Sequence, residues 1–182
     1  MTLEPKYQWL LKEKGPLMIT KALELYDTKE LSGKPNNPVI IAWAKEVGAD
    51  VAKVYTADEI PWCGLFMAVV AKRASKQVVK DPLWALNWGN FGTYSPVPML
   101  GDVLTFIRIT DKGTKAGHVA LYIGEDTDHY HILGGNQSDK VCITRIAKTR
   151  LYTARRPNYN SQPKNVRVIK LANDGVISTN EG

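Results

Sequence analysis

The sequence predicts an α+β domain in which helices come first and an antiparallel sheet follows. Before residue 98, apolar residues recur at helical spacing between proline and glycine boundaries. After it, short runs rich in β-branched and aromatic residues alternate with turn-forming residues. Grouped helices followed by grouped strands favour α+β over α/β. The 182 residues suffice for one domain with a substantial core.

The helices are delimited by capping residues. Asn37 is a suitable N-cap, Pro38 fits a first helical position and Gly48 fits just beyond a helix end. Pro61 likewise suits a first turn, and Trp84 and Trp88, one turn apart, are expected in the core. The alternative for this aromatic stretch is that the residues that follow Gly89 form one wall of a binding groove. The segments expected to be helical are 15–31, 39–47, 60–75 and 81–89.

The second half of the chain predicts a meandering sheet, with a turn over 110–117 and a loop over 134–140. The tail 158–182 is polar and short of aromatic residues, so it is expected to be peripheral. One domain, 1–157, is therefore predicted, with a helical part over 1–50 and a core over 58–157 that contains Cys63 and His118. The expected strands are 102–109, 118–124, 129–133, 141–146 and 151–157.

The net charge of +6 favours an anionic partner. The basic residues are spread along the chain, so no stable nucleic-acid partner is expected. No apolar run approaches the roughly 20 residues that span a bilayer, which argues against membrane insertion. The first 20 residues lack the features of a secretory signal, so synthesis and folding in the cytoplasm are expected.

Two cysteines do not indicate a disulfide framework in such a chain. Cys63 lies in the first turn of the helix expected to begin near Pro61. Cysteines at helix N-termini have lowered pKa values and are nucleophilic near neutral pH. The alternative is a cysteine that packs as a small hydrophobic side chain.

A thiolate nucleophile needs a base, usually histidine. His118 begins a predicted strand, and the two-residue period places it on the face of Ala120, opposite Val119 and Leu121. The small Ala120 leaves room above the imidazole for the tip of a helix. A structural histidine at a strand end is the alternative.

The other two histidines, His129 and His131, share a face of the next strand, and Cys142 lies on the strand after it. These three could begin a zinc site, but no fourth ligand has typical spacing. Packing or solvated histidines are the preferred interpretation. An orienting group for His118 is expected in the loop over 134–140, which follows the strand of His129 and His131. Asn136 is the first choice there and Gln137 a substitute, and His131 on the strand itself is a further substitute.

Four motifs occur in the order and spacing of papain-like cell-wall amidases, namely PWCGLFMAVV, LGDVLTF, GHVALYIGE and LGGNQSD. Over 16–157 the chain resembles the cysteine, histidine-dependent amidohydrolase/peptidase (CHAP) family and its NlpC-type relatives. It is most similar to phage and prophage proteins that also share NNPVI upstream. The resemblance implies a papain-like fold, with the nucleophile at a helix start packed on a C-terminal antiparallel sheet.

The resemblance assigns Cys63 as nucleophile, His118 as general base and Asn136 as the polar orienting residue. It implies no cofactor. Some family members bind calcium through an acidic cluster before the cysteine, but only Asp58 and Glu59 are present here, so no metal is expected. Further residues expected to bind substrate or stabilise the oxyanion are Tyr55, Trp62, Asn90 and Gln137.

These residues imply a peptidoglycan endopeptidase or amidase, such as a phage lysis or tail-associated enzyme. Bacterial peptidoglycan is the expected partner and the enzyme is expected to be a monomer. It would act on the wall after release from the host cytoplasm, or as part of a virion. Two alternatives remain open, a non-enzymatic basic virion module and a toxin-type amidase effector.

Overall fold

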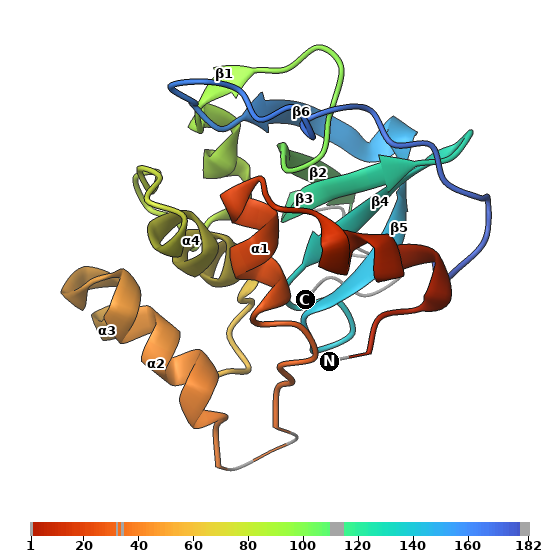
Figure 1. The fold of residues 1–182 in the computed structure, drawn as a ribbon. Helices are drawn as coiled ribbons and strands as arrows, with labels where there is room; N and C mark the ends of the chain where they lie inside the picture. The colour runs from red at the N-terminus through yellow and green to blue at the C-terminus, as the bar shows by residue number, and fades with distance from the viewer. Residues whose placement is uncertain (1, 32, 34, 110–114, 179–182) are drawn as a thin grey trace.

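The computed structural model describes residues 2–31, 33, 35–109 and 115–178. Helices gather on one side of a single curved sheet (Figure 1), and Lys6 near the beginning of the described chain is hydrogen-bonded to Asp174 near its end. This is the predicted α+β class. The helical segments are η1 (Pro5–Lys12), α1 (Leu17–Leu23), α2 (Pro38–Val47), α3 (Ala49–Val54), α4 (Cys63–Arg73), η2 (Ala85–Asn90) and η3 (Lys148–Arg150), where η marks 3₁₀-helix.

The six-stranded sheet has the order β1-β6-β2-β3-β4-β5, and all its pairs are antiparallel. The strands β2 to β5 follow one another as a meander, which confirms the prediction, and β6 returns to the other edge of β2. The strands are β1 (Thr93–Tyr94), β2 (Val103–Ile109), β3 (Lys115–Glu125), β4 (His129–Gly134), β5 (Cys142–Ala147) and β6 (Leu151–Arg156).

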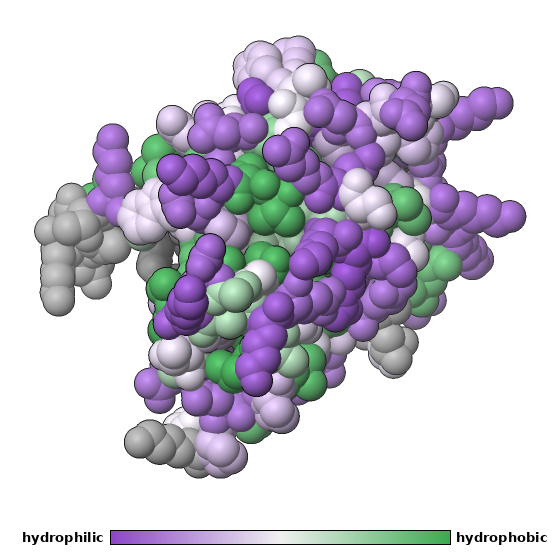
Figure 2. Space-filling view, turned by 90° about the vertical axis from the view of Figure 1, so that its left-hand side faces the viewer, coloured by the Kyte–Doolittle hydropathy of each residue, from purple (hydrophilic) through white to green (hydrophobic). Residues whose placement is uncertain are grey.

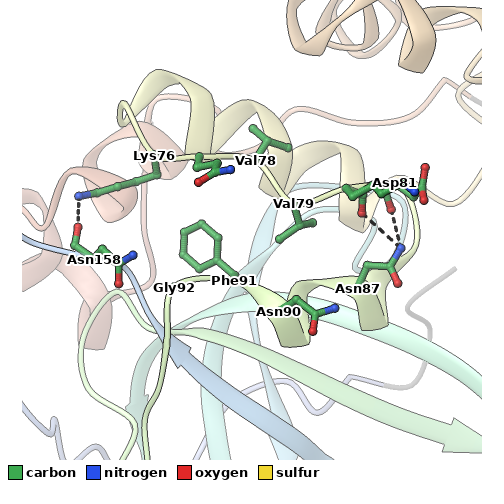
Figure 3. A pocket seen from close by; sticks show the side chains of 11 residues that line it. Lys76, Val78, Val79, Asp81, Asn87, Asn90, Phe91, Gly92 and Asn158 are labelled. Atoms are coloured by element: carbon green, nitrogen blue, oxygen red, sulfur yellow. Dashed lines mark hydrogen bonds between the residues drawn. The ribbon is translucent and has the colours of Figure 1, made fainter.

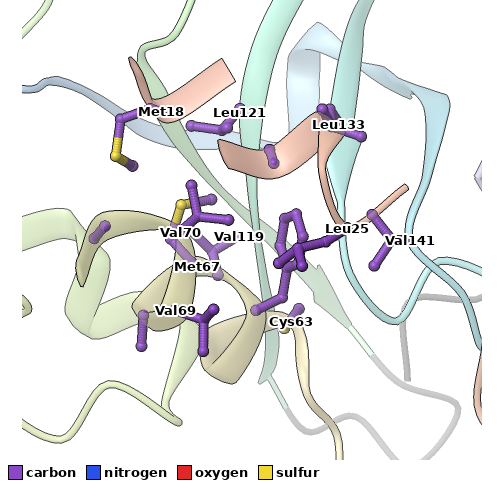
Figure 4. Close-up of a cluster of buried hydrophobic side chains, with 14 of the residues drawn as sticks. Met18, Leu25, Cys63, Met67, Val69, Val70, Val119, Leu121, Leu133 and Val141 are labelled. Atoms are coloured by element: carbon purple, nitrogen blue, oxygen red, sulfur yellow. The ribbon is translucent and has the colours of Figure 1, made fainter. Parts of the chain in front are cut away.

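The helix α4 lies at the centre of the core. Every residue from Cys63 to Ala71 is buried, so this helix is apolar on all sides. One of its faces packs on β3, where Met67 and Val70 meet Val119 (Figure 4). The other faces are covered by α1, α2 and η2.

The face of β3 opposite α4 carries a second, smaller cluster. Ala120 and Tyr122 of β3 pack there with Phe106, Tyr130 and Ile132. The sheet thus buries apolar side chains on both faces, which explains why β3 is an almost continuous apolar run.

The local signals of α2 are confirmed in detail. The Asn37 side chain accepts a hydrogen bond from Val39 N at 2.8 Å, and Pro38 is the first helical residue. Gly48 ends α2, but the chain continues directly into the short helix α3, which the sequence did not predict. Gly48, with extended backbone, connects the two helices.

Two helix predictions are corrected. The first predicted helix is much shorter, because α1 ends at Leu23 and turns follow. The fourth is a 3₁₀-helix that buries Trp88 but leaves Trp84 58% exposed, so only one of the two tryptophans is in the core. The helix η1 and the two-residue strand β1 were not predicted.

Of the turn predicted over 110–117, residues 110–114 lie outside the described part of the chain. Residues 115–117 belong to β3. The segment 158–178 has no named element, but it is bound to the sheet by two isolated parallel bridges, Glu125 with Lys170 and Arg145 with Ile177. Within the described residues, no helix combines the length and apolar character needed to cross a membrane.

Candidate active site

Cys63 is the first residue of α4. Trp62 occupies the N-cap position but its side chain accepts no hydrogen bond from the first turn, so the main-chain N–H groups there have no side-chain cap. Gly64 allows the segment before η2 to pass against this turn, since a Cβ atom there would lie 2.3 Å from Pro82 O. The motif WCG therefore builds a tightly packed helix start.

His118 lies within β3, paired in register with Phe106 of β2. Its side chain lies on the face of Ala120, as predicted from the strand period. Its Nε2 is 3.1 Å from Oε1 of Gln137, which belongs to the loop between β4 and β5.

Gln137 is held so that its oxygen faces the imidazole. Its Nε2 donates to Cys142 O at 2.6 Å, which identifies Oε1 as the atom that accepts from His118. The hydrogen on His118 is thereby assigned to Nε2, and Nδ1 carries the lone pair of the neutral ring. Gly134 leaves space for this amide, because a Cβ there would lie 2.9 Å from Gln137 Oε1.

The hydrogen-bond contact of the imidazole with this loop is to the amide of Gln137 and not to that of Asn136, the first choice. Asn136 has φ 56°, in the left-handed region. The Asn136 Oδ1 is buried without a hydrogen-bond partner in the described part of the chain. The substitute His131 is engaged elsewhere, as described below.

The start of α4 and His118 belong to one end of the sheet. The strand β4 ends at Gly134, and the ring of Trp62 and the side chain of Phe66 cover the next residue, Gly135. The body of α4 packs on the Val119 face of β3, which corrects the expectation that the helix tip covers the Ala120 face. Because the pairing of β4 with β3 begins at Leu121, the sheet has an edge beside His118.

Both candidate catalytic side chains are buried. Cys63 is 3% exposed and His118 is 1% exposed. Cys63 belongs to the same buried cluster as Leu25 and Val141 (Figure 4). A substrate therefore reaches the thiol only if residues that cover it move.

The other expected site residues occupy different surroundings. Tyr55 is buried and its hydroxyl donates to Asp58 O at 3.4 Å, so its proton is not directed to a substrate oxygen. The indole of Trp62 is buried and donates to Glu30 at 3.2 Å, a packing role. Asn90 is exposed at the end of η2 and faces a hollow described below.

A second buried polar cluster was not predicted. His131 accepts from the Tyr7 hydroxyl at Nδ1 (2.6 Å), and its Nε2 lies 3.0 Å from Asp126 Oδ2. Asp126 also accepts from Arg145 Nε at 2.8 Å and from the main-chain N–H of His129. Tyr7 belongs to η1, far away in sequence, so no local pattern could have revealed the contact.

The cluster fixes the charge states of its members. Burial lowers the pKa of His131 and outweighs the opposing effect of Asp126. Burial alone raises the pKa of Asp126, but hydrogen bonds from the main chain, Arg145 and His131 prevail and hold that pKa well below its usual range. Burial also raises the pKa of Tyr7. Tyr7 therefore keeps its proton and His131 is neutral, beside an ionised Asp126.

The zinc alternative is not supported by the arrangement of its residues. His129 and His131 both approach Asp126, whereas the Cys142 thiol donates to Gln137 O at 3.3 Å. Within the described ranges, no group of three or more His, Cys, Asp or Glu side chains could hold a metal ion. Burial raises the pKa of Cys142, so this second thiol stays protonated near neutral pH.

The Gly-Asp motif before β2 has a structural role. Asp102 is fully buried and accepts from Ser95 Oγ at 2.8 Å and from Met99 N at 2.9 Å. Arg156 of β6 binds the same carboxylate through Nε and a terminal nitrogen. This bidentate pair joins the start of β2 to the last strand.

Comparisons of the chain with protein-family models, with curated proteins and with solved structures found no match. The functional argument therefore depends on the geometry of these side chains and on the motifs of the sequence.

Proposed function

We propose that the protein is a cysteine-dependent amidohydrolase with a papain-like arrangement, in which Cys63 is the nucleophile and His118 the general base. The contact between His118 Nε2 and Gln137 Oε1 is the observation that carries the proposal. A neutral amide that accepts from Nε2–H orients the ring and assigns Nδ1 to proton transfer. A cysteine in the first helical position adds the other requirement, because a helix start favours a thiolate.

In the proposed reaction the Cys63 proton moves to Nδ1 of His118 as the sulfur attacks an amide carbonyl carbon. The carbonyl π electrons move to oxygen, and main-chain N–H groups at the start of α4 stabilise the oxyanion. The C–N bond then breaks, the imidazolium gives its proton to the leaving amine, and a thioester remains. Water hydrolyses the thioester with His118 as base, releasing a carboxylic acid and regenerating the thiol.

The proposed substrate is a peptide amide bond of bacterial peptidoglycan. The motifs around Cys63 and His118 support this substrate, and the net charge of +6 favours an anionic wall. Because Cys63 and His118 are buried, binding must displace part of their cover before the thiol can attack. Turnover is therefore expected to include an opening step.

Hydrolysis of purified wall sacculi tests the proposal. Wild type should release new amino groups, while Cys63→Ala and His118→Ala should not, although both keep the wild-type circular dichroism. Cys142→Ala is the matched control, because it removes the other buried thiol, and it should retain hydrolysis. An active Cys63→Ala variant would disprove the proposed nucleophile.

A basic binding module without catalysis is the second candidate, favoured by the burial of both Cys63 and His118. It predicts salt-sensitive binding to sacculi that is unchanged in Cys63→Ala, with no amino groups released by wild type. Iodoacetamide labelling separates the two candidates further. The proposed enzyme requires faster alkylation of Cys63 than of Cys142, whose burial raises its pKa.

A further inference from the structure

A hollow of about 410 Å³ lies between the segment that follows α4 and η2. The same segment continues to Pro82, whose carbonyl oxygen packs on Gly64 at the start of α4. On the helix side of the molecule, hydrophilic side chains surround smaller hydrophobic areas (Figure 2). The hollow is bordered by the segment after α4, by η2 and by the start of the tail, through Lys76, Lys80, Asn87, Asn90, Phe91 and Asn158 (Figure 3).

The walls of the hollow are held by side-chain to main-chain hydrogen bonds. Lys76 Nζ donates to Asn158 O at 2.5 Å and so joins segments 82 residues apart. Asn87 Nδ2 donates to Asp81 O at 2.9 Å, and Arg155 Nε donates to Phe91 O at 2.6 Å. The shape of the hollow is therefore largely set before any ligand binds, which lowers the entropic cost of binding.

The lining offers the chemistry that recognises a sugar. Because Asn87 uses its nitrogen internally, its Oδ1 remains as an acceptor, while the exposed amide of Asn90 supplies both a donor and an acceptor. Such amides match hydroxyl and acetamido groups. The Phe91 ring, 4% exposed and packed against Trp88, borders the hollow and gives it a small apolar area for the C–H groups of a sugar (Figure 3).

The charge of the lining favours an acidic sugar. Lys76 and Lys80 bring two ammonium groups and Asp81 brings one carboxylate, which gives a net charge of +1. Lys76 uses one of its three N–H donors on Asn158 O and its Nζ lies 4.8 Å from the centre of the Tyr159 ring, and its remaining donors can bind a carboxylate.

We propose that this hollow binds a carboxylate-bearing amino sugar of a glycan strand. Binding of the sugar does not require Cys63, whereas its use as an anchor for wall hydrolysis rests on the proposed function. A peptide-free sugar of the strand held here would keep the wall beside the enzyme while a peptide on a neighbouring sugar enters at Cys63.

Isotope-labelled Cys63→Ala protein titrated with N-acetylmuramic acid tests the inference by NMR. We expect saturable shift changes at Asn87, Asn90 and Phe91, and at least tenfold weaker binding of N-acetylglucosamine, which lacks the carboxylate. Lys76→Gln with Lys80→Gln should also weaken binding at least tenfold. Lys53→Gln, an exposed position on α3, removes a charge elsewhere and should leave binding unchanged.

Absence of binding, or shift changes confined to other surfaces, would overturn the inference. Equal binding of the two sugars would overturn its acidic specificity. If the sugar binds but wild type leaves sacculi uncut, the hollow stands and the proposed function fails. If wild type cuts sacculi but the sugar does not bind, the proposed function stands and the inference about the hollow fails.

Discussion

Two buried histidines on neighbouring strands have different partners. His131 is 0% exposed and is hydrogen-bonded at both nitrogens, to the Tyr7 hydroxyl and to the Asp126 carboxylate. His118 is 1% exposed, and its Nε2 meets the neutral amide of Gln137. Residue type and burial are therefore the same, and only the partners differ.

The contacts of His131 indicate a structural role. His131 links η1 to β4 and belongs to a charged cluster whose atoms are hydrogen-bonded to one another. The partner of His118 is a neutral amide, which adds no buried charge. The proposed chemistry belongs to His118 alone, so variants of the two histidines test it.

Substitution of the two histidines should give the largest difference in activity between variants. His118→Ala should lower hydrolysis of sacculi by about 10³-fold or more, because both the thiol and the leaving amine lose their proton partner. His131→Phe should retain activity per folded molecule but lose about 1–3 kcal/mol of stability in urea, since it leaves buried polar atoms unpaired. A loss of activity in folded His131→Phe equal to that of His118→Ala would remove the distinction.

Substitution of Gln137, the partner of His118, should give the next largest loss of activity. Gln137→Ala should lower kcat by about 10- to 100-fold, the value of one buried hydrogen bond converted to a rate, and should shift the pH profile of kcat. Asn136→Gly is the matched control, since glycine tolerates the φ of 56° there, and its kcat should stay close to wild type. If Asn136→Gly loses more activity than Gln137→Ala, the first-choice orienting residue was right after all.

Acidification should destabilise the protein through the second histidine. His131 has a lowered pKa in the fold, so between its folded value and the ordinary value near 6.5 the unfolded chain binds more protons. Stability thus falls as pH falls below about 6.5, and the depressed pKa of Asp126 adds a further loss below about pH 4. Urea unfolding at pH 7.5 and 5.0 measures the slope, which should be shallower in His131→Phe. An equal slope in the variant would place the acid sensitivity elsewhere.

Removal of one hydroxyl should have the smallest effect. Tyr7→Phe deletes the hydrogen bond to His131 Nδ1 and keeps the ring, so it should cost about 1 kcal/mol of stability. Urea unfolding at pH 7.5 measures the cost, and hydrolysis of sacculi should not change. A loss of activity would show that the two histidine sites are coupled.

The sequence determined the elements whose signals are local. The cap of α2 by Asn37, the placement of Cys63 in the first turn of a helix and the meander of β2 to β5 follow from residue types and their period. The strand period also placed His118 on the face of Ala120. These predictions succeeded because they depend on neighbours only a few residues away.

Only the tertiary structure decided which polar groups meet. The folded loop after β4 places Gln137 and not Asn136 against His118, and the docking of η1 places Tyr7 against His131, 124 residues away. Packing also buried Trp88 while leaving Trp84 exposed. A hydrogen bond depends on distances of a few tenths of an ångström, and sequence spacing does not define distances between segments that only the folded core brings together.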